Sequence, residues 1–171
     1  TDAYGFISNI KESHVFTRKD KAVVLGAGGA ARAVVKALKD EGFGHIIVTN
    51  RTFDKARILA RDFSVEAADW EHRHDALPGA ALLVNTTTLG MKGAPTLQLD
   101  LKNLPQDALV NDIVYAPLMT ELLLNAKARG HAVADGIGML LHQAVPCFEA
   151  WFGVRPEVTA GLRSHILGRM A

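Results

Sequence analysis

The glycine-rich segment from Gly26 to Ala31 constrains the fold more than any other part of the sequence. It follows a short apolar run, residues 21–25, that has the pattern of a buried parallel strand. After it, apolar residues recur at positions 31, 34, 35 and 38, the spacing of an amphipathic helix. Between a strand and a helix, the spacing Gly26-x-Gly28-x-x-Ala31 matches the fingerprint in which the first glycine permits a tight turn and the second lets phosphate approach the backbone. We therefore expect a βα unit that binds a dinucleotide.

The rest of the chain alternates between strand-like and helix-like patterns. Further strands are expected at residues 45–49, near 65, and at 82–85, 108–114 and 131–134. Helices are expected at residues 1–13, 54–63, 119–129 and 139–152 and from 156 onward, with a kink or local break at Pro146. This alternation predicts a single domain, residues 1–171, of the α/β class: a Rossmann-type doubly wound parallel sheet with helices on both faces and a ligand crevice at the carboxyl ends of the strands.

Composition excludes several classes of partner. Nineteen basic and eighteen acidic side chains leave a formal net charge of +1, so no broad field would attract nucleic acid or an anionic membrane. The single cysteine, Cys147, cannot form an internal disulfide, and neither a leader peptide nor a long apolar run is visible. No metal site is expected, because His72-x-His74 has no further ligands at a recognisable spacing. The cytoplasm is the expected location.

The residues after the second strand favour one cofactor. An acid at this position would bind the adenosine ribose hydroxyl of NAD(H), but the chain carries Asn50-Arg51-Thr52 with Lys55 one turn later. Arginine and lysine would instead pair with the 2′-phosphate of NADP(H). The alternative is that Arg51 and Lys55 are ordinary solvated cations on the surface. Asp54 either competes for Lys55 or begins the next helix.

Six motifs in order resemble the shikimate dehydrogenase family, specifically its C-terminal NADP-binding domain. They are Thr1-Asp2-Ala3-Tyr4-Gly5, Gly26-Ala27-Gly28-Gly29-Ala30, Asn50-Arg51-Thr52, Asn85-Thr86-Thr87-Thr88-Leu89-Gly90-Met91, Asp112-Ile113-Val114-Tyr115 and Asp135-Gly136-Ile137-Gly138-Met139-Leu140-Leu141-His142-Gln143.

The resemblance implies reversible, NADP(H)-dependent reduction of 3-dehydroshikimate to shikimate, a step of aromatic amino-acid biosynthesis. It makes Asp2 the catalytic aspartate and places Asp2, Tyr115 and Gln143 near the substrate. Its partner lysine belongs to an N-terminal substrate domain that this chain lacks. Asp2 could also cap a helix that begins at Ala3, which would not exclude catalysis. Gln143 could instead be a helix residue satisfied by a backbone partner.

The positions expected at the cofactor share either a place in the glycine loop or a place just after a strand. They are Gly26, Ala27, Gly28, Gly29, Ala30, Asn50, Arg51, Thr52, Lys55, Asn85, Thr86, Thr87, Ile113, Gly136, Gly138 and Met139. Two alternatives stand beside this assignment: residues 85–91 as a plain polar turn, and Gly136 with Gly138 as a plain helix-entry turn.

The start at Thr1, without an initiator methionine, indicates a fragment. The helical segments at 1–13 and about 139–171 are expected to pack toward the missing substrate domain, Trp151 is expected to be a packing residue, and a homodimer is possible. We expect the isolated chain to bind NADPH with little or no turnover. The alternatives are a quinate/shikimate dehydrogenase-like enzyme with a different substrate and a non-catalytic NADP-binding module.

Overall fold

A computed structural model describes residues 1–170, without the side chain of Met170, and Ala171 of the expected C-terminal segment lies outside it. Its centre is a six-stranded sheet, all parallel, in the order β3-β2-β1-β4-β5-β6. The strands are β1 (Lys21–Leu25), β2 (His45–Asn50), β3 (Glu66–Asp69), β4 (Leu82–Asn85), β5 (Leu109–Asp112) and β6 (Ala132–Ala134). The strand order reverses between β1 and β4, where such sheets bind ligands at their carboxyl ends. The predicted Rossmann-type fold is confirmed.

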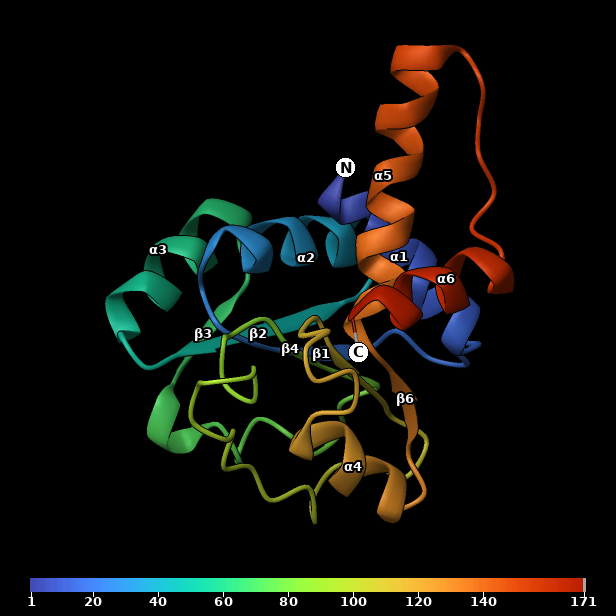
Figure 1. Ribbon diagram of the computed structural model, residues 1–171. Coiled ribbons are helices and arrows are strands. Elements are labelled where there is room, and N and C mark those ends of the chain that lie inside the picture. The colour runs from blue at the N-terminus through green and yellow to red at the C-terminus, as the bar shows by residue number, and fades with distance from the viewer. Residues whose placement is uncertain (171) are drawn as a thin grey trace.

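Helices cover both faces of the sheet (Figure 1). One face carries α1 (Asp2–Ser13), α2 (Gly29–Asp40) and α3 (Phe53–Phe63), and the other carries the short helix η1 (Trp70–His72) and α4 (Glu121–Ala128). Helix α5 (Gly136–Phe152) projects beyond the sheet, and α6 (Ala160–Met170) returns to its base.

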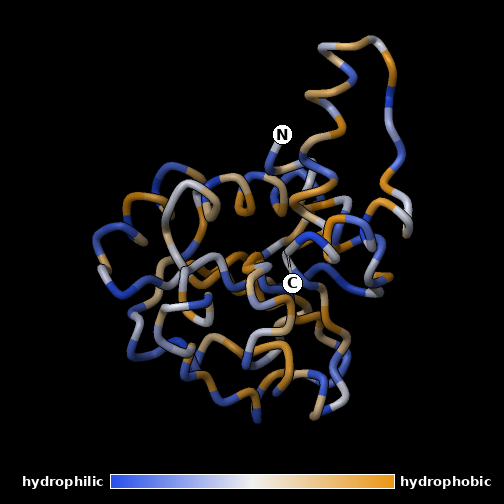
Figure 2. The backbone as a smooth tube through the Cα atoms, in the orientation of Figure 1, coloured by the Kyte–Doolittle hydropathy of each residue, from blue (hydrophilic) through white to orange (hydrophobic). Residues whose placement is uncertain are grey.

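Each face of the sheet has its own apolar core because alternate side chains of a strand point to opposite faces. Val24 and Val48 join the core under α2, whereas Val23 and Leu83 join the core over α4. The central strands are therefore apolar over nearly their whole length, as the hydropathy colouring shows (Figure 2).

Several details differ from the expectations. The alternation of strand and helix is interrupted between β4 and β5, where Leu97, Leu101 and Leu104 cover the sheet from irregular backbone. Helix α5 begins three residues early because the side chain of Asp135 accepts a hydrogen bond from the amide of Ile137 at 3.2 Å. The helix also continues through Pro146 without the local break.

Two further differences concern helix starts. Helix α6 begins at Ala160 rather than Pro156. Thr1 is the N-cap residue of α1, so Asp2 is its first helical residue and not its cap. No helix within residues 1–170 has both the length and the apolar composition that a membrane crossing requires.

Candidate cofactor and substrate site

The glycine loop joins the carboxyl end of β1 to α2. Gly26 has a φ of +107°, and a Cβ there would lie 2.5 Å from Thr86 Oγ1 and 3.2 Å from the Thr86 carbonyl carbon, so only glycine fits. Its amide donates to Thr49 O at 2.7 Å, which ties the loop to β2. A Cβ added at Gly28 or Gly29 would meet nothing within 4 Å. The space in front of these two residues is therefore open to a ligand.

The start of α2 offers free backbone donors to that space. The amide of Arg32 donates to Gly28 O at 3.2 Å, so the amides of Gly29, Ala30 and Ala31 have no intrahelical acceptor. No side chain caps the helix at Gly28. Unpaired amides and the positive end of the helix dipole together favour a phosphate group at this point.

The end of β2 carries a second group of donors. Arg51 and Lys55 are exposed, and neither forms an ion pair within residues 1–169. Asp54 pairs with Arg57 at 3.2 Å, not with Lys55, which resolves the alternative left open by the sequence. Thr52 is the N-cap of α3 and makes no capping hydrogen bond, while Asn50 Nδ2 donates to Thr52 O at 2.9 Å and holds the turn. Two cations thus flank an uncapped helix N-terminus.

The turn after β4 is built on Asn85, whose side chain is fully buried. Its Oδ1 accepts hydrogen bonds from the amide and the hydroxyl of Thr87, at 3.0 and 2.7 Å, and its Nδ2 donates to Leu89 O at 3.2 Å. Thr86 Oγ1 donates to Leu25 O at 2.7 Å. The side chain of Asn85 is therefore occupied within the protein, and its expected place at the cofactor stays a prediction. Asn85 orders the turn, whereas Thr86 and Thr87 lie half-buried beside the glycine loop.

Asp112, which the sequence placed in a motif without a role, is the buried partner of Asn85. Its Oδ1 accepts from Asn85 Nδ2 and from the amide of Val114, both at 3.0 Å, and its Oδ2 accepts from Thr120 Oγ1 at 2.7 Å. Burial raises the pKa of this carboxyl group, and the three hydrogen bonds counteract the rise in part. An acid at the end of an otherwise apolar strand was the available signal in the sequence.

Gly136 and Gly138 face protein where cofactor was expected. A Cβ at Gly136 would lie 2.2 Å from Ile113 O, and a Cβ at Gly138 would lie 1.8 Å from Asn9 Oδ1. Asn9 Nδ2 in turn donates to Asp135 O at 2.7 Å. Only glycine fits at these two positions, because the loop after β5 and helix α1 pack directly against α5. Met139 beside them belongs to the core. Their side-chain directions are filled by the protein itself, and any nicotinamide contact would use other backbone atoms.

The expected substrate residues lie around the N-terminal turn of α1. Asp2 is exposed at the start of the helix, and Gly5, one turn later, packs so closely on α5 that its Cβ would lie 2.8 Å from Gln143 Cβ. Residues three apart share a helix face, so Asp2 and Gln143 belong to the same side of the α1–α5 contact. Gln143 is half-buried and makes no side-chain hydrogen bond within residues 1–169, so the backbone partner that the alternative required is missing.

Tyr115 reaches the same end of the sheet from another element. Tyr115 lies three residues after the end of β5 and is 42% exposed. Ile113, the first residue after the strand, is half-buried and donates its amide to Asn85 O at 3.1 Å. Tyr115 therefore lies where the carboxyl ends of β4 and β5 open to solvent.

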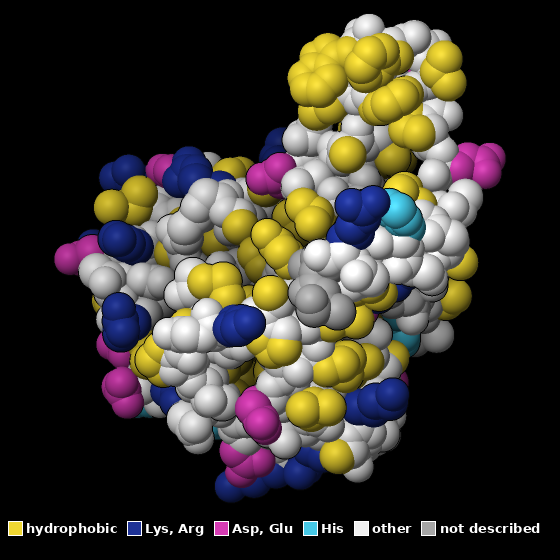
Figure 3. All heavy atoms as spheres, in the orientation of Figure 1, with side chains coloured by type: hydrophobic (Ala, Val, Ile, Leu, Met, Phe, Trp, Pro, Cys, Tyr) yellow, Lys and Arg dark blue, Asp and Glu magenta, His cyan; other side chains and the backbone are white. Residues whose placement is uncertain are grey.

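The far end of α5 is an apolar surface. Trp151 is 77% exposed and Phe152 64% exposed, so Trp151, expected to be a packing residue, does not pack within the described part of this chain. With Phe148 and Val154 they form an apolar tip, which Figure 3 shows as a cluster of yellow side chains on the projecting part of the molecule. A contiguous exposed apolar surface of this kind is typical of a contact site.

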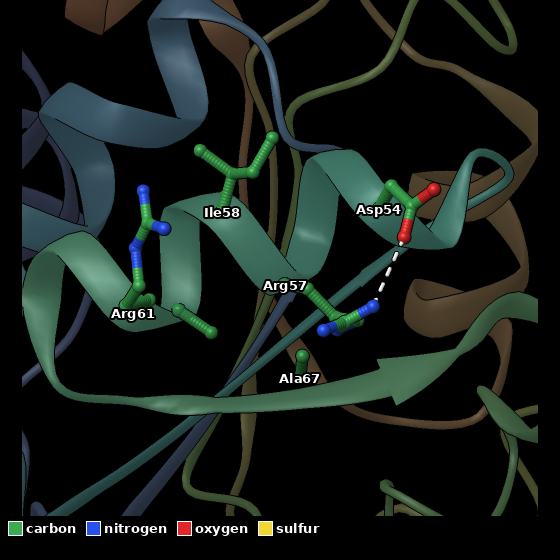
Figure 4. A pocket seen from close by; sticks show the side chains of 6 residues that line it. Asp54, Arg57, Ile58, Arg61 and Ala67 are labelled. Carbon is green, nitrogen blue, oxygen red and sulfur yellow. Dashed lines mark hydrogen bonds and ion pairs between the residues drawn. The ribbon is translucent and has the colours of Figure 1, made fainter.

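The surface also has a hollow between α3 and β3, away from the glycine loop. Figure 4 shows Arg57 directed toward Asp54 on the side of α3 that faces Ala67 of β3. The hollow is lined by Asp54, Arg57, Ile58, Ala60, Arg61 and Ala67. None of the expected site residues lines it, so the open space at the glycine loop is the better candidate for a ligand.

Comparison with known proteins gives consistent matches. Residues 10–90 match the family described as shikimate / quinate 5-dehydrogenase. The shikimate dehydrogenase (NADP(+)) of Paramagnetospirillum magneticum is 54% identical over 171 residues, which cover 98% of this chain and 62% of that protein. The chain therefore spans less than two thirds of the length of this relative.

Solved structures agree in fold. Quinate dehydrogenase from Corynebacterium glutamicum in complex with NAD has a TM-score of 0.90 at 33% identity, over 98% of this chain and 62% of that one. Shikimate 5-dehydrogenase from Thermus thermophilus in complex with NADP(H) and shikimate has a TM-score of 0.78 at 37% identity, over 91% of this chain and 57% of that one.

Proposed function

The chain belongs to the shikimate dehydrogenase family, and on this premise we propose that it is the cofactor-binding part of an NADP(H)-dependent oxidoreductase that interconverts 3-dehydroshikimate and shikimate. One observation carries the choice of cofactor: Arg51 and Lys55 stand without ion-pair partners, within residues 1–169, at the uncapped start of α3. An anion that reaches the end of β2 meets two cations and free helix amides there.

The described residues fit NADP(H) along the whole switch point of the sheet. The open space at Gly28 and Gly29 and the free amides of α2 would receive the pyrophosphate. Arg51 and Lys55 would bind the 2′-phosphate of the adenosine half. The other nucleotide would then lie over the ends of β4 and β5, beside Thr86, Thr87 and Tyr115.

When bound, NADP(H) supplies or accepts the hydride. The reduced carbonyl oxygen needs a proton donor, and a lysine paired with Asp2 would be that donor. No lysine forms an ion pair with Asp2 among residues 1–169. We therefore place the lysine in a second domain of the whole protein. The apolar tip of α5 supports such a domain, because it offers a contact surface near Arg155, which follows α5 and donates a hydrogen bond to Tyr4 of α1.

A titration with reduced cofactors tests the cofactor assignment. We expect the chain to bind NADPH at least about tenfold more tightly than NADH, because the 2′-phosphate adds a charge-assisted contact. Arg51→Ala should remove most of this preference. Arg57→Ala is the matched control, since Arg57 lies on the same helix but is paired with Asp54, and it should leave the preference unchanged. Tighter binding of NADH than of NADPH would overturn the assignment.

An NAD-dependent quinate dehydrogenase is the second candidate, because the structure of one with NAD has a TM-score of 0.90 to this chain. Tighter NADH binding in the same titration would favour it. An assay of the complete gene product distinguishes the enzyme from a non-catalytic module. Shikimate-dependent reduction of NADP⁺ that Asp2→Asn abolishes, while NADPH binding is retained, supports the enzyme. No reduction of NADP⁺ by the wild type supports the module.

A further inference from the structure

The carboxylate of Asp112 is a buried junction between loops that the proposed function uses separately. It is the last residue of β5 and lies opposite Asn85, the last residue of β4, in the sheet register. Both side chains are fully buried. Three donors from three segments converge on the two carboxylate oxygens: Asn85, Val114 and Thr120.

On one side, the junction leads to the glycine loop. Asn85, held by Asp112, orients Thr87 through both the amide and the hydroxyl of that residue. Thr86 and Thr87 occupy the space next to Gly26, where an added Cβ would lie 2.5 Å from Thr86 Oγ1 and 3.1 Å from Thr87 Cγ2. A shift of Asn85 would therefore be transmitted to the wall of the cofactor groove.

On the other side, the junction leads to Tyr115 and to two helices. The hydrogen bond to the amide of Val114 sets the direction of the chain just before Tyr115. Thr120, which donates to Asp112, is the N-cap of α4 and accepts from the amide of Leu123 at 3.4 Å. The carbonyl of Ile113 lies against Gly136 at the start of α5. Hydrogen bonds to one carboxylate thus position both the start and the end of the segment between β5 and α4.

We propose that Asp112 is a positioning residue that fixes the turn at residues 85–89 relative to the loop at 113–120 and so shapes the nicotinamide end of the groove; this inference rests on the proposed function. The adenosine end is built on β2 and α3, and the side chains of Arg51 and Lys55 make no hydrogen bond to Asn85 or Asp112 within residues 1–169. A change at Asp112 should therefore act on one half of the cofactor only.

Measuring the affinity of the 171-residue chain for two ligands distinguishes an effect at the nicotinamide end of the groove from one at the adenosine end. NADPH occupies both ends, whereas adenosine 2′-monophosphate lacks the nicotinamide nucleotide and also the 5′-phosphate that would lie at the glycine loop. We expect Asp112→Ala to weaken NADPH binding about tenfold and to change the affinity for the monophosphate by less than about twofold. Asp112→Asn, which keeps an acceptor for Asn85 and Val114, should restore most of the NADPH affinity. Equal losses for both ligands, no loss of NADPH, or no rescue by asparagine would overturn the proposal.

Thr120→Val provides a second variant if Asp112→Ala does not fold. It keeps the shape of the side chain and removes the donor to Asp112 together with the long capping contact to Leu123, so NADPH affinity should fall about threefold with the affinity for the monophosphate unaffected. No change in NADPH affinity would contradict the proposal.

Amide spectra of the ligand-free chain give a readout that is independent of the proposed function. Asp112→Asn and Thr120→Val should shift the amide signals of Thr87 and Leu89 as well as Val114. Shifts confined to residues adjacent in sequence would overturn the coupling of the two loops. A wild-type chain that bound neither ligand would refute the proposed function instead, and these spectra would still decide on Asp112.

Discussion

The buried carboxylate of Asp112 accepts a hydrogen bond from the side-chain amide of Asn85, 3.0 Å away, across the carboxyl ends of β4 and β5. Burial is the main influence on Asp112, and it raises the pKa of the carboxyl group above its ordinary value. The partners that bind this carboxylate are all neutral: Asn85, Val114 and Thr120.

This raised pKa predicts how stability depends on pH. Between the unfolded pKa, about 3.9, and the raised folded pKa, the native state binds more protons than the unfolded state. The free energy of unfolding of the wild type should therefore fall relative to that of Asp112→Asn as pH rises through this interval, and the difference should then stay level. Urea unfolding of both proteins from about pH 4 to pH 7 measures it. A difference that is constant throughout would mean that Asp112 titrates normally.

Alanine substitutions at Gly28 and Gly26 of the glycine loop should have different effects on stability and on NADPH binding. Gly28 has a φ of −87°, and an added Cβ meets nothing within 4 Å, so Gly28→Ala should cost only about 0.5–1 kcal/mol for a poorer N-cap residue. The new methyl group would point into the space expected for pyrophosphate and should weaken the binding of NADPH about tenfold. Calorimetric titration and urea unfolding check the two effects.

Gly26→Ala is the opposite case and serves as the comparison. Its φ of +107° and the 2.5 Å approach to Thr86 Oγ1 make alanine strained as well as crowded. We expect a loss of about 2–3 kcal/mol in the free energy of unfolding. If Gly28→Ala were as destabilising as Gly26→Ala, the open space at Gly28 would have been misassigned.

Local patterns predicted the parts of the fold that depend on neighbours in sequence. Apolar runs predicted β1, β2 and β4, and the glycine spacing predicted the turn into α2. Strand burial and loop geometry each depend on a few consecutive residues, so both can be recognised in the sequence. The assignment of Arg51 to the cofactor, which stays a prediction, rests in the same way on its position after a strand.

Features that join distant segments could not be predicted in this way. The Asn85–Asp112 pair spans 27 residues and depends on the register of β4 and β5. Gly138 faces Asn9 across the α1–α5 contact, so its small size serves helix packing that no single segment reveals. The sheet cover at residues 86–108 has no periodicity because Leu97, Leu101 and Leu104 reach the core from irregular backbone. The helix start at Asp135 was predictable in principle from its capping side chain.

Arg18 forms a clamp that a lysine cannot reproduce. Its guanidinium donates to both carboxylate oxygens of Asp107, at 2.8 and 2.9 Å, and to the carbonyls of Gly79 and Ala80 at 2.7 and 3.0 Å. The side chain of Arg18 is 28% exposed and that of Asp107 55% exposed, so solvent screening reduces the ionic part. We expect Arg18→Lys to lose about 1 kcal/mol in the free energy of unfolding, since the planar fork is lost although the charge is kept. Lys36→Ala, which breaks a pair of exposed side chains, is the control and should change stability by less than about 0.5 kcal/mol.

The apolar tip of α5 should contribute to association rather than to the stability of this chain. Trp151 is 77% exposed, so Trp151→Ser should change the free energy of unfolding by less than about 0.5 kcal/mol. Phe6→Ala, at a fully buried position of α1, should cost about 3–5 kcal/mol. Sedimentation velocity should show less self-association for Trp151→Ser than for the wild type, because the exposed apolar surface is reduced. A destabilisation by Trp151→Ser as large as that by Phe6→Ala would mean that the tip packs within the chain and is not a contact surface.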